Sequence, residues 1–176
     1  MKNYFIIYIL SFCFLSNISW GQNILEEKLI YRGNLAFHQE SDEPVTGIVI
    51  SKYETGETKE KGEYVDGLRE FEWKEFHQNG TVKSTINYKN GFKEGPFEIY
   101  FEDGKIKALG NYVKGLEDGN WQEFSNEGNF LYIGNYNQGN LNGRWQTFHL
   151  NGRLFSMGNF IEGQKEGLWE YFNEQG

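Results

Sequence analysis

The sequence has few of the residues that build the commonest small functional sites. Of 176 residues, one is cysteine, three are histidine and two are proline. One cysteine excludes an intrachain disulfide framework and a cysteine-based zinc site. Scarce proline, without a three-residue glycine period, excludes a collagen-like chain. Basic residues number 17 against 25 acidic ones, and the net charge of −8 argues against nucleic acid and anionic membrane as main partners.

Long apolar runs are also missing, apart from a short one near the N-terminus. That run, Phe5 to Leu15, is too short to span a bilayer. Ser19-Trp20-Gly21 then supplies small residues at the −3 and −1 positions of a cleavage site. Residues 1–21 are therefore predicted to be a signal peptide cut near Gly21, which implies export to the periplasm, the cell envelope or the medium. The alternatives are an uncleaved anchor and lipidation at Cys13, which the large residue before it disfavours.

Glycine, with 22 residues, and aromatic side chains, at 18%, are abundant and recur with a period of 24. The aromatic area excludes a disordered chain. The ladders divide the chain from residue 47 into units 47–70, 71–94, 95–118, 119–142 and 143–166, with a partial unit 167–176. The glycine ladders are Gly56, Gly80, Gly104, Gly128, Gly152 and Gly176, and Gly67, Gly91, Gly115, Gly139 and Gly163. The ladders rich in aromatics are Tyr64, Tyr88, Tyr112, Tyr136 and Phe160; Val49, Trp73, Phe97, Trp121, Trp145 and Trp169; and Phe76, Tyr100, Phe124, Phe148 and Phe172.

Each unit has the pattern of a β-hairpin. Dipeptides such as Asn79-Gly80 and Asp66-Gly67 tolerate the positive φ of tight turns. The segments between turns alternate apolar and polar residues, and no stretch after Gln22 has a helical period. Two turns in every unit predict an all-β fold: an elongated, single-layer antiparallel meander of eleven strands.

The ladders also predict the two faces of this sheet. A glycine inside a strand marks a close approach by another group, so Gly62, Gly110, Gly134 and Gly158 are expected to make room for a Trp or Phe ring. Ile86 takes the equivalent place in the second unit, where packing should differ. The opposite face is polar early, at Lys59, Lys61 and Glu63, and apolar later, at Leu131, Ile133, Phe155 and Met157.

The two ends of the array differ from its units. Leu29 to Phe37 reads as a hairpin turning at Arg32-Gly33-Asn34, and residues 22–46 are interpreted as an N-terminal cap with an acidic loop, because repeat arrays need atypical end units. The last segment, Leu168 to Glu174, is expected to be an exposed edge strand.

The unit Gly-x-Trp-x-x-Phe/Tyr-x-x-x-Gly, followed by Gly-x-Tyr-x-x-Gly, resembles the MORN repeat in its bacterial variant form. The lead-in with Leu29, Tyr31, Gly33, Pro44 and Gly47 resembles secreted bacterial proteins grouped as YwqK-family antitoxins. The first resemblance implies an elongated antiparallel sheet used for protein scaffolding or lipid binding. The second implies neutralisation of a partner toxin, and the signal peptide favours an exported or periplasmic partner.

Residues that could carry chemistry are scattered. His77 and His149 stand three units apart and cannot share a metal ion, so the histidines are interpreted as solvated side chains near turns. The acidic residues, including Glu70, Glu94 and Glu117, stand at variable positions, as solvated charges do; a carboxylate active site and a weak calcium site are the alternatives. No nucleophile elbow or phosphate-binding loop occurs. We therefore expect no enzyme activity, catalytic residue, metal or cofactor.

The aromatic rows remain as candidates for binding. Their first role is to pack on one another, but a single-layer sheet leaves part of them exposed, and Trp and Tyr are favoured interface anchors. The expected function is thus that of an exported, non-catalytic scaffold or protein-binding module for an unidentified protein or peptide. An antitoxin or immunity role and a lipid-associated module are the alternatives, and the C-terminal strand offers an edge for self-association. The candidate partner-binding residues are Trp73, Trp121, Trp145, Trp169 and Tyr171.

Overall fold

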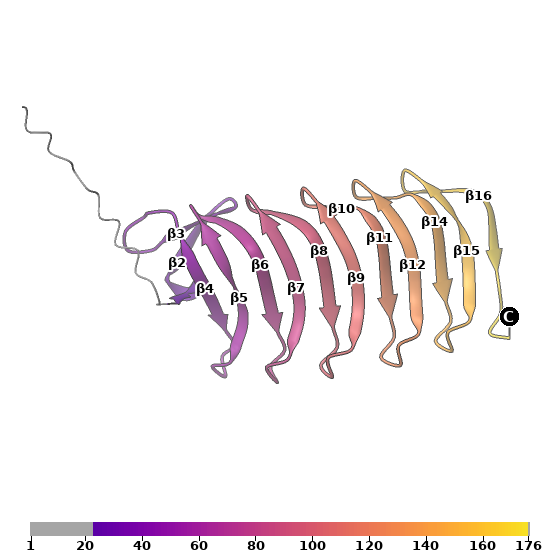
Figure 1. The fold of residues 1–176 in the computed structure, drawn as a ribbon, viewed down its shortest axis with the longest axis horizontal. Coiled ribbons are helices and arrows are strands. Elements are labelled where there is room, and N and C mark those ends of the chain that lie inside the picture. Colours follow the sequence, from indigo (N-terminus) through magenta and orange to yellow (C-terminus); the bar gives the residue numbers. More distant parts are fainter. Residues whose placement is uncertain (1–22, 176) are drawn as a thin grey trace, which may run out of the picture.

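The structure, a computed structural model, describes residues 23–175. The predicted signal peptide, residues 1–21, lies outside the described residues. The rest confirms the predicted fold: consecutive hairpins follow one another along one elongated, twisted sheet (Figure 1). The strands before the array are β1 (Ile24–Leu25), β2 (Leu29–Arg32) and β3 (Leu35–His38). The strands of the array are β4 (Gly47–Lys52), β5 (Thr58–Val65), β6 (Leu68–Phe76), β7 (Val82–Lys89), β8 (Phe92–Tyr100), β9 (Ile106–Val113), β10 (Leu116–Glu117), β11 (Gly119–Phe124), β12 (Phe130–Asn137), β13 (Asn140–Leu141), β14 (Gly143–Phe148), β15 (Leu154–Ile161) and β16 (Gln164–Tyr171).

The main sheet has 14 strands, three more than the sequence predicted. Two of them, β10 and β13, are short pieces split from β11 and β14, where the sequence predicted one continuous strand. The third, β1, corrects the expectation of a purely antiparallel meander, because it pairs in parallel with β4. A 3-10 turn, Glu26–Lys28, links β1 to β2, and β2 and β3 form a separate two-stranded sheet. Repeat periodicity could not reveal β1, since it precedes the repeats.

The two glycine ladders form two kinds of turn, one at each end of the strands (Figure 1). We call these two rows of turns the upper and lower edges, as they appear in Figure 1. At the upper edge, both residues of each two-residue turn have positive φ, as at Asp66 (49°) and Gly67 (80°). At the lower edge, Gly80 closes a longer turn: its N–H donates to the His77 carbonyl at 2.9 Å with φ at 82°. Positive φ favours glycine at both places, which explains why two ladders are needed.

Neighbouring units are also joined along the upper edge. The N–H of each turn glycine donates to a backbone carbonyl of the preceding hairpin, as Gly91 does to Arg69 at 3.0 Å and Gly139 does to Glu117 at 2.8 Å. The side chains of Glu70 and Glu94 accept from the N–H groups of Asn90 and Lys114 in the next turn. These bonds fix the spacing between hairpins and give two of the acidic residues a structural role.

The core is the aromatic face of the sheet. The Trp73, Trp121, Trp145 and Trp169 rings lie against the in-strand glycines of the preceding strand, as predicted: a Cβ added to Gly62 would lie 2.0 Å from the Trp73 ring, and one added to Gly134 would lie 1.8 Å from Trp145. Where Ile86 replaces glycine, it faces Phe97 instead of a tryptophan. A tryptophan thus lies against each of the four glycines Gly62, Gly110, Gly134 and Gly158, and the smaller ring of Phe97 lies next to the isoleucine, so the size of the ring matches the space available.

The two ends of the sheet are finished differently. At the N-terminal end, Leu29, Ala36 and Val45 pack with Val49 of β4 and Trp73 of β6 into one buried cluster. Ala36 also donates to the Gly67 carbonyl at 2.8 Å, so the β2–β3 hairpin is bonded to the first upper turn. At the other end, β16 is exposed along nearly its whole length.

Candidate binding surface

The five candidate residues differ widely in exposure. Trp73 and Trp121 are core residues, with 3% and 7% of their surface exposed, so their rings offer a partner little area. Trp145 and Trp169 are half-buried, and Tyr171 is 60% exposed. The tryptophan row is therefore more buried at its start than we expected for a single layer, and it becomes accessible from Trp145, in the fifth unit, onward.

Aromatic rings form a nearly continuous ladder along this face. Most contacts are edge-to-face, the arrangement that ring quadrupoles favour. In the second unit, Trp73 meets Tyr64 at 5.0 Å and Tyr88 at 6.1 Å between ring centroids. In the fourth, Trp121 meets Tyr112 at 5.3 Å and Tyr136 at 5.7 Å. The ladder continues through Trp145 and Phe160 to Trp169.

A second row of side chains, which the sequence reasoning missed, covers this ladder. Its members stand directly opposite the ladder residues in the sheet: Arg69 opposite Tyr64, Lys93 opposite Tyr88 and Lys165 opposite Phe160. They recur at the repeat period, a signal that could have found them. Arg69 lies 3.9 Å from the centre of the Trp73 ring, Lys93 lies 4.6 Å from Tyr112 and Lys165 lies 4.1 Å from Trp169. We call Arg69, Lys93, Glu117, Leu141 and Lys165 the covering row.

The covering row changes chemistry in the middle of the array. Glu117 stands opposite Tyr112 and Leu141 opposite Tyr136, where the other units place a cation. Burial, and after it the Glu117 carboxylate, raises the pKa of both Tyr112 and Tyr136. Burial, and after it the Glu123 carboxylate, raises the pKa of Tyr132 to about 12. Tyr132 and Tyr136 therefore lie beside carboxylates, and no cation from residues 23–175 lies over either ring.

Two of the three histidines, His77 and His149, join neighbouring hairpins at the lower edge, which corrects their interpretation as solvated side chains. The Nε2 of His77 lies 3.1 Å from the Tyr100 carbonyl, and the Nε2 of His149 lies 2.9 Å from the Phe172 carbonyl. Since a carbonyl only accepts, each Nε2 carries the proton and donates. Tyr53, at the same repeat position, donates its hydroxyl to the Phe76 carbonyl at 2.6 Å.

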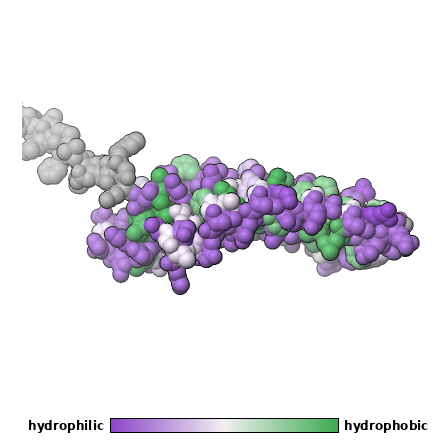
Figure 2. Space-filling model, turned by 90° about the horizontal axis from the view of Figure 1, so that it is seen from below, coloured by the Kyte–Doolittle hydropathy of each residue, from purple (hydrophilic) through white to green (hydrophobic). Residues whose placement is uncertain are grey.

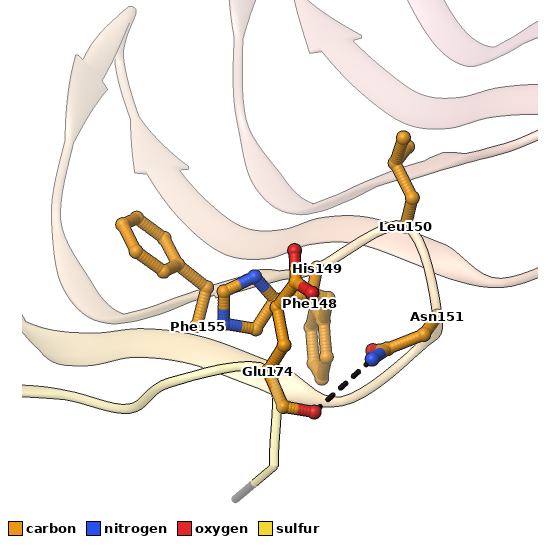
Figure 3. A pocket seen from close by; sticks show the side chains of 6 residues that line it. All are labelled: Phe148, His149, Leu150, Asn151, Phe155 and Glu174. Atoms are coloured by element: carbon orange, nitrogen blue, oxygen red, sulfur yellow. Dashed lines mark hydrogen bonds between the residues drawn. The ribbon is translucent and has the colours of Figure 1, made fainter.

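A shallow hollow of about 480 Å³ lies at the lower edge near the end of the array (Figure 3). The rings of His149 and Phe155 meet edge-to-face at 5.0 Å on one side of it. On the other side, Asn151 donates to the backbone carbonyl of Glu174 at 3.2 Å. Leu150, which is 77% exposed, borders the opening. The hollow adds apolar surface next to the exposed Tyr171, whose ring centroid lies 6.1 Å from that of Phe155.

The opposite face of the sheet changes along the array in the same direction. Its central row starts at Ile50, is polar at Lys61, Lys74, Thr85 and Glu98, and ends at Glu170. Between Glu98 and Glu170, apolar and neutral polar residues alternate: Leu109, Gln122, Ile133, Gln146 and Met157. Seen from below, the molecule is mostly hydrophilic, with hydrophobic patches that include one near the C-terminal end (Figure 2). Both faces thus present apolar area in the later units.

Neither a metal-binding cluster nor a membrane-spanning helix is found over residues 23–175. No group of three His, Cys, Asp or Glu side chains there is placed to hold a metal ion. No helix in that range is long and apolar enough to span a membrane.

Comparison with known proteins identifies part of the array. No curated protein matches the chain. A solved structure described as the crystal structure of the GtfA/B complex bound to UDP and GlcNAc matches with 13% identity and a TM-score of 0.25, over 75% of this chain and 23% of that chain. The family model described as the MORN repeat variant matches residues 69–90 and 93–114, which are two consecutive repeats of the sheet described above.

Proposed function

We propose that this chain is a non-catalytic binding module that holds a protein partner against the later units of its sheet. The observation that supports it best is the exposure of large apolar side chains there: Leu150 and Leu168 are 77% and 79% exposed, and Tyr171 is 60% exposed. Tyr171 lies beside the half-buried Trp169, with 6.5 Å between the ring centroids. Large exposed apolar side chains in one part of a molecule are typical of interaction surfaces, with aromatic residues as anchors.

The roles of the polar residues support binding over catalysis. The ring nitrogens of His77 and His149 are used for bonds between hairpins. Glu70 and Glu94 bond turn N–H groups, and Glu60 and Glu75 pair with cations. General acid–base chemistry needs a titratable group within reach of a substrate, and these side chains are committed to holding the sheet.

The finer parts of the proposal rest on the sequence. Export rests on the features of residues 1–21. An antitoxin or immunity role would be the same binding activity directed at a toxin, and the resemblance to YwqK-family antitoxins is its support. Attachment to membrane lipid is disfavoured by the net charge of −8, since anionic bilayers attract basic segments.

Site-specific photocrosslinking in the producing cells tests the proposal. A photoreactive phenylalanine replaces Tyr171 in one variant and the exposed Glu54, at the far end of the array, in a control. A discrete adduct with another protein from position 171, and none from position 54, is expected. An adduct between two copies of the chain would assign the surface to edge-to-edge self-association of β16. Equal adducts from both positions, or a hydrolase activity abolished by Glu→Gln variants, would overturn the proposal.

A further inference from the structure

Residues 60–88 and 108–136 occupy equivalent positions two units apart, but only the first segment has cations paired with its half-buried carboxylates. In residues 60–88, both Arg69 nitrogens bond the Glu60 carboxylate, at 2.9 and 3.0 Å, while the guanidinium lies over Trp73. Lys83 pairs with Glu75 at 2.7 Å. Two units later, the equivalents of Glu60, Arg69, Glu75 and Lys83 are Ala108, Glu117, Glu123 and Leu131. At these positions the first segment has two ion pairs, whereas the second segment has two carboxylates and no cation.

The aromatic framework around these positions is the same in both segments. Tyr64 meets Trp73 at 84° and Tyr112 meets Trp121 at 86°, both edge-to-face. The register is the same too, with Arg69 opposite Tyr64 and Glu117 opposite Tyr112. The second segment therefore keeps the rings that Arg69 covers in the first segment, without the guanidinium.

Glu117 and Glu123 are both half-buried and unpaired. Glu123 stands between Ala108 and Tyr132 in the sheet, and Glu117 stands opposite Tyr112. Over residues 23–175, neither carboxylate forms an ion pair or accepts a hydrogen bond. A half-buried carboxylate beside aromatic rings gains most from a cation that also stacks on those rings.

We propose that the partner inserts an arginine or lysine side chain beside Glu117, over the half-buried Tyr136 ring, as Arg69 lies over Tyr88 two units earlier. The inference rests on the proposed function and names the chemistry of the partner: a basic segment. Tyr136 and the neighbouring Trp145 are half-buried, so ring area remains for the incoming group. The net charge of −8 favours the approach of such a segment.

A basic side chain fits this position better than a metal ion. A divalent cation needs several oxygen ligands, and no three acidic or histidine side chains are grouped anywhere in residues 23–175. One carboxylate flanked by ring faces suits a guanidinium or ammonium group, which combines one charge-assisted bond with stacking. Arg69 combines the same two contacts within this chain.

The test uses the peptide acetyl-Gly-Arg-Gly-amide and its norleucine counterpart, which lacks the charge. Binding is followed by the indole N–H signal of Trp121 in heteronuclear NMR, assigned by its loss in Trp121→Phe. The arginine peptide should give a saturable shift and the norleucine peptide none. Glu117→Gln should weaken binding about fivefold, because it removes the charge of one partly exposed ion pair and leaves the stacking in place. Glu117→Arg should abolish binding, because its guanidinium would occupy the position.

Glu54→Arg changes the net charge as much as Glu117→Arg does, at an exposed residue far from the site, and should bind the peptide as the unmodified chain does. Circular dichroism checks that each variant is folded; Glu117→Gln, which keeps size and shape, decides the result if Glu117→Arg does not fold. Equal shifts by both peptides, or binding unchanged in Glu117→Gln, would overturn the inference. If position 171 still gives its crosslink despite such a result, the proposed binding module stands. Only the proposed basic side chain of the partner is then rejected.

Discussion

Residues 60–88 and 108–136 have the same arrangement of strands and aromatic rings. They differ in the side chains that lie over those rings. Both set a tryptophan against an in-strand glycine and two tyrosines edge-to-face on that tryptophan. Above the rings, the first segment is closed by Arg69, and the second carries Glu117. The rings are held by their fit against the strand glycines, and their arrangement is nearly the same in both segments. The covering row lies on the outer side of the rings and differs between the segments. Function can therefore change in the covering row without changing the fold.

The largest expected effect on stability comes from breaking the contact between a strand glycine and a tryptophan ring, which both segments have. Replacing Gly110 by alanine would place a Cβ 2.4 Å from the Trp121 ring, and the same change at Gly62 would place one 2.0 Å from Trp73. Because such overpacking is destabilising, we expect each variant to lose about 2–3 kcal/mol of unfolding free energy. Urea denaturation measures this loss. Both variants should lose similar amounts, because the ring geometry is the same.

A double variant tests whether the clash with the ring is the cause. Phe97 follows Ile86 in the sheet, so a phenyl ring tolerates a side chain where the indole does not. Trp121→Phe combined with Gly110→Ala should therefore be more stable than the sum of the single losses by about 1 kcal/mol. Strict additivity would show that the alanine acts on the backbone alone.

The second effect separates the segments. Arg69→Met removes a guanidinium that lies over Trp73 and leaves Glu60, with 26% of its side chain exposed, without its partner. We expect a loss of about 2 kcal/mol, from the cation–π contact and the uncompensated carboxylate. Glu117→Met, the matched change, should be neutral or stabilising, since no partner is lost. Equal losses in chemical denaturation would mean that both side chains act only as apolar cover.

Part of this comparison could be predicted from the sequence and part could not. The ladders predicted the hairpins, the two turn edges and the contact of Gly62 with an aromatic ring, because backbone conformation and steric fit act within one repeat. The parallel strand β1 precedes the repeat and carries only two paired residues, Ile24 and Leu25. Nothing in its two residues distinguishes it from a loop.

The covering row was missed for a different reason. Arg69, Lys93 and Lys165 are separated by whole repeat periods, but Glu117 and Leu141 interrupt the row with other chemistry. A search for identical residues passes over such a row. The register opposite Tyr64, Tyr88 and Phe160 shows that the five positions are one feature. The histidine bonds were missed because they join neighbouring units rather than residues within one unit.

A third, smaller effect appears in alkaline solution. Burial, followed by the Glu123 carboxylate, raises the pKa of Tyr132 to about 12 from 10.0. A raised folded-state pKa contributes stability below pH 10 that is lost as the pH rises from 10 towards 12. Urea denaturation at pH 9 and pH 11 should show a loss, of which about 1 kcal/mol is absent in Tyr132→Phe. The first segment has Ser84 at this position, so it makes no such contribution. A loss that is the same with and without Tyr132 would assign the effect to other tyrosines.

The smallest effect concerns the residue two positions before the tryptophan of each segment. The second segment has Gly119 there, with φ at 73°, and the first has Phe71, with φ at 60° and 59% of its surface exposed. A left-handed conformation costs an L-residue about 1–2 kcal/mol, whereas glycine loses about 0.5–1 kcal/mol through unfolded-state entropy instead. Phe71→Gly should therefore stabilise the chain by about 0.5 kcal/mol. Phe92→Gly is the matched control: Phe92 is 55% exposed and does not have positive φ, so the same substitution should cost about 1 kcal/mol. If thermal unfolding shows equal losses in the two variants, the contact of Phe71 with Tyr88 across the strands outweighs the backbone strain, and the first segment needs its phenylalanine.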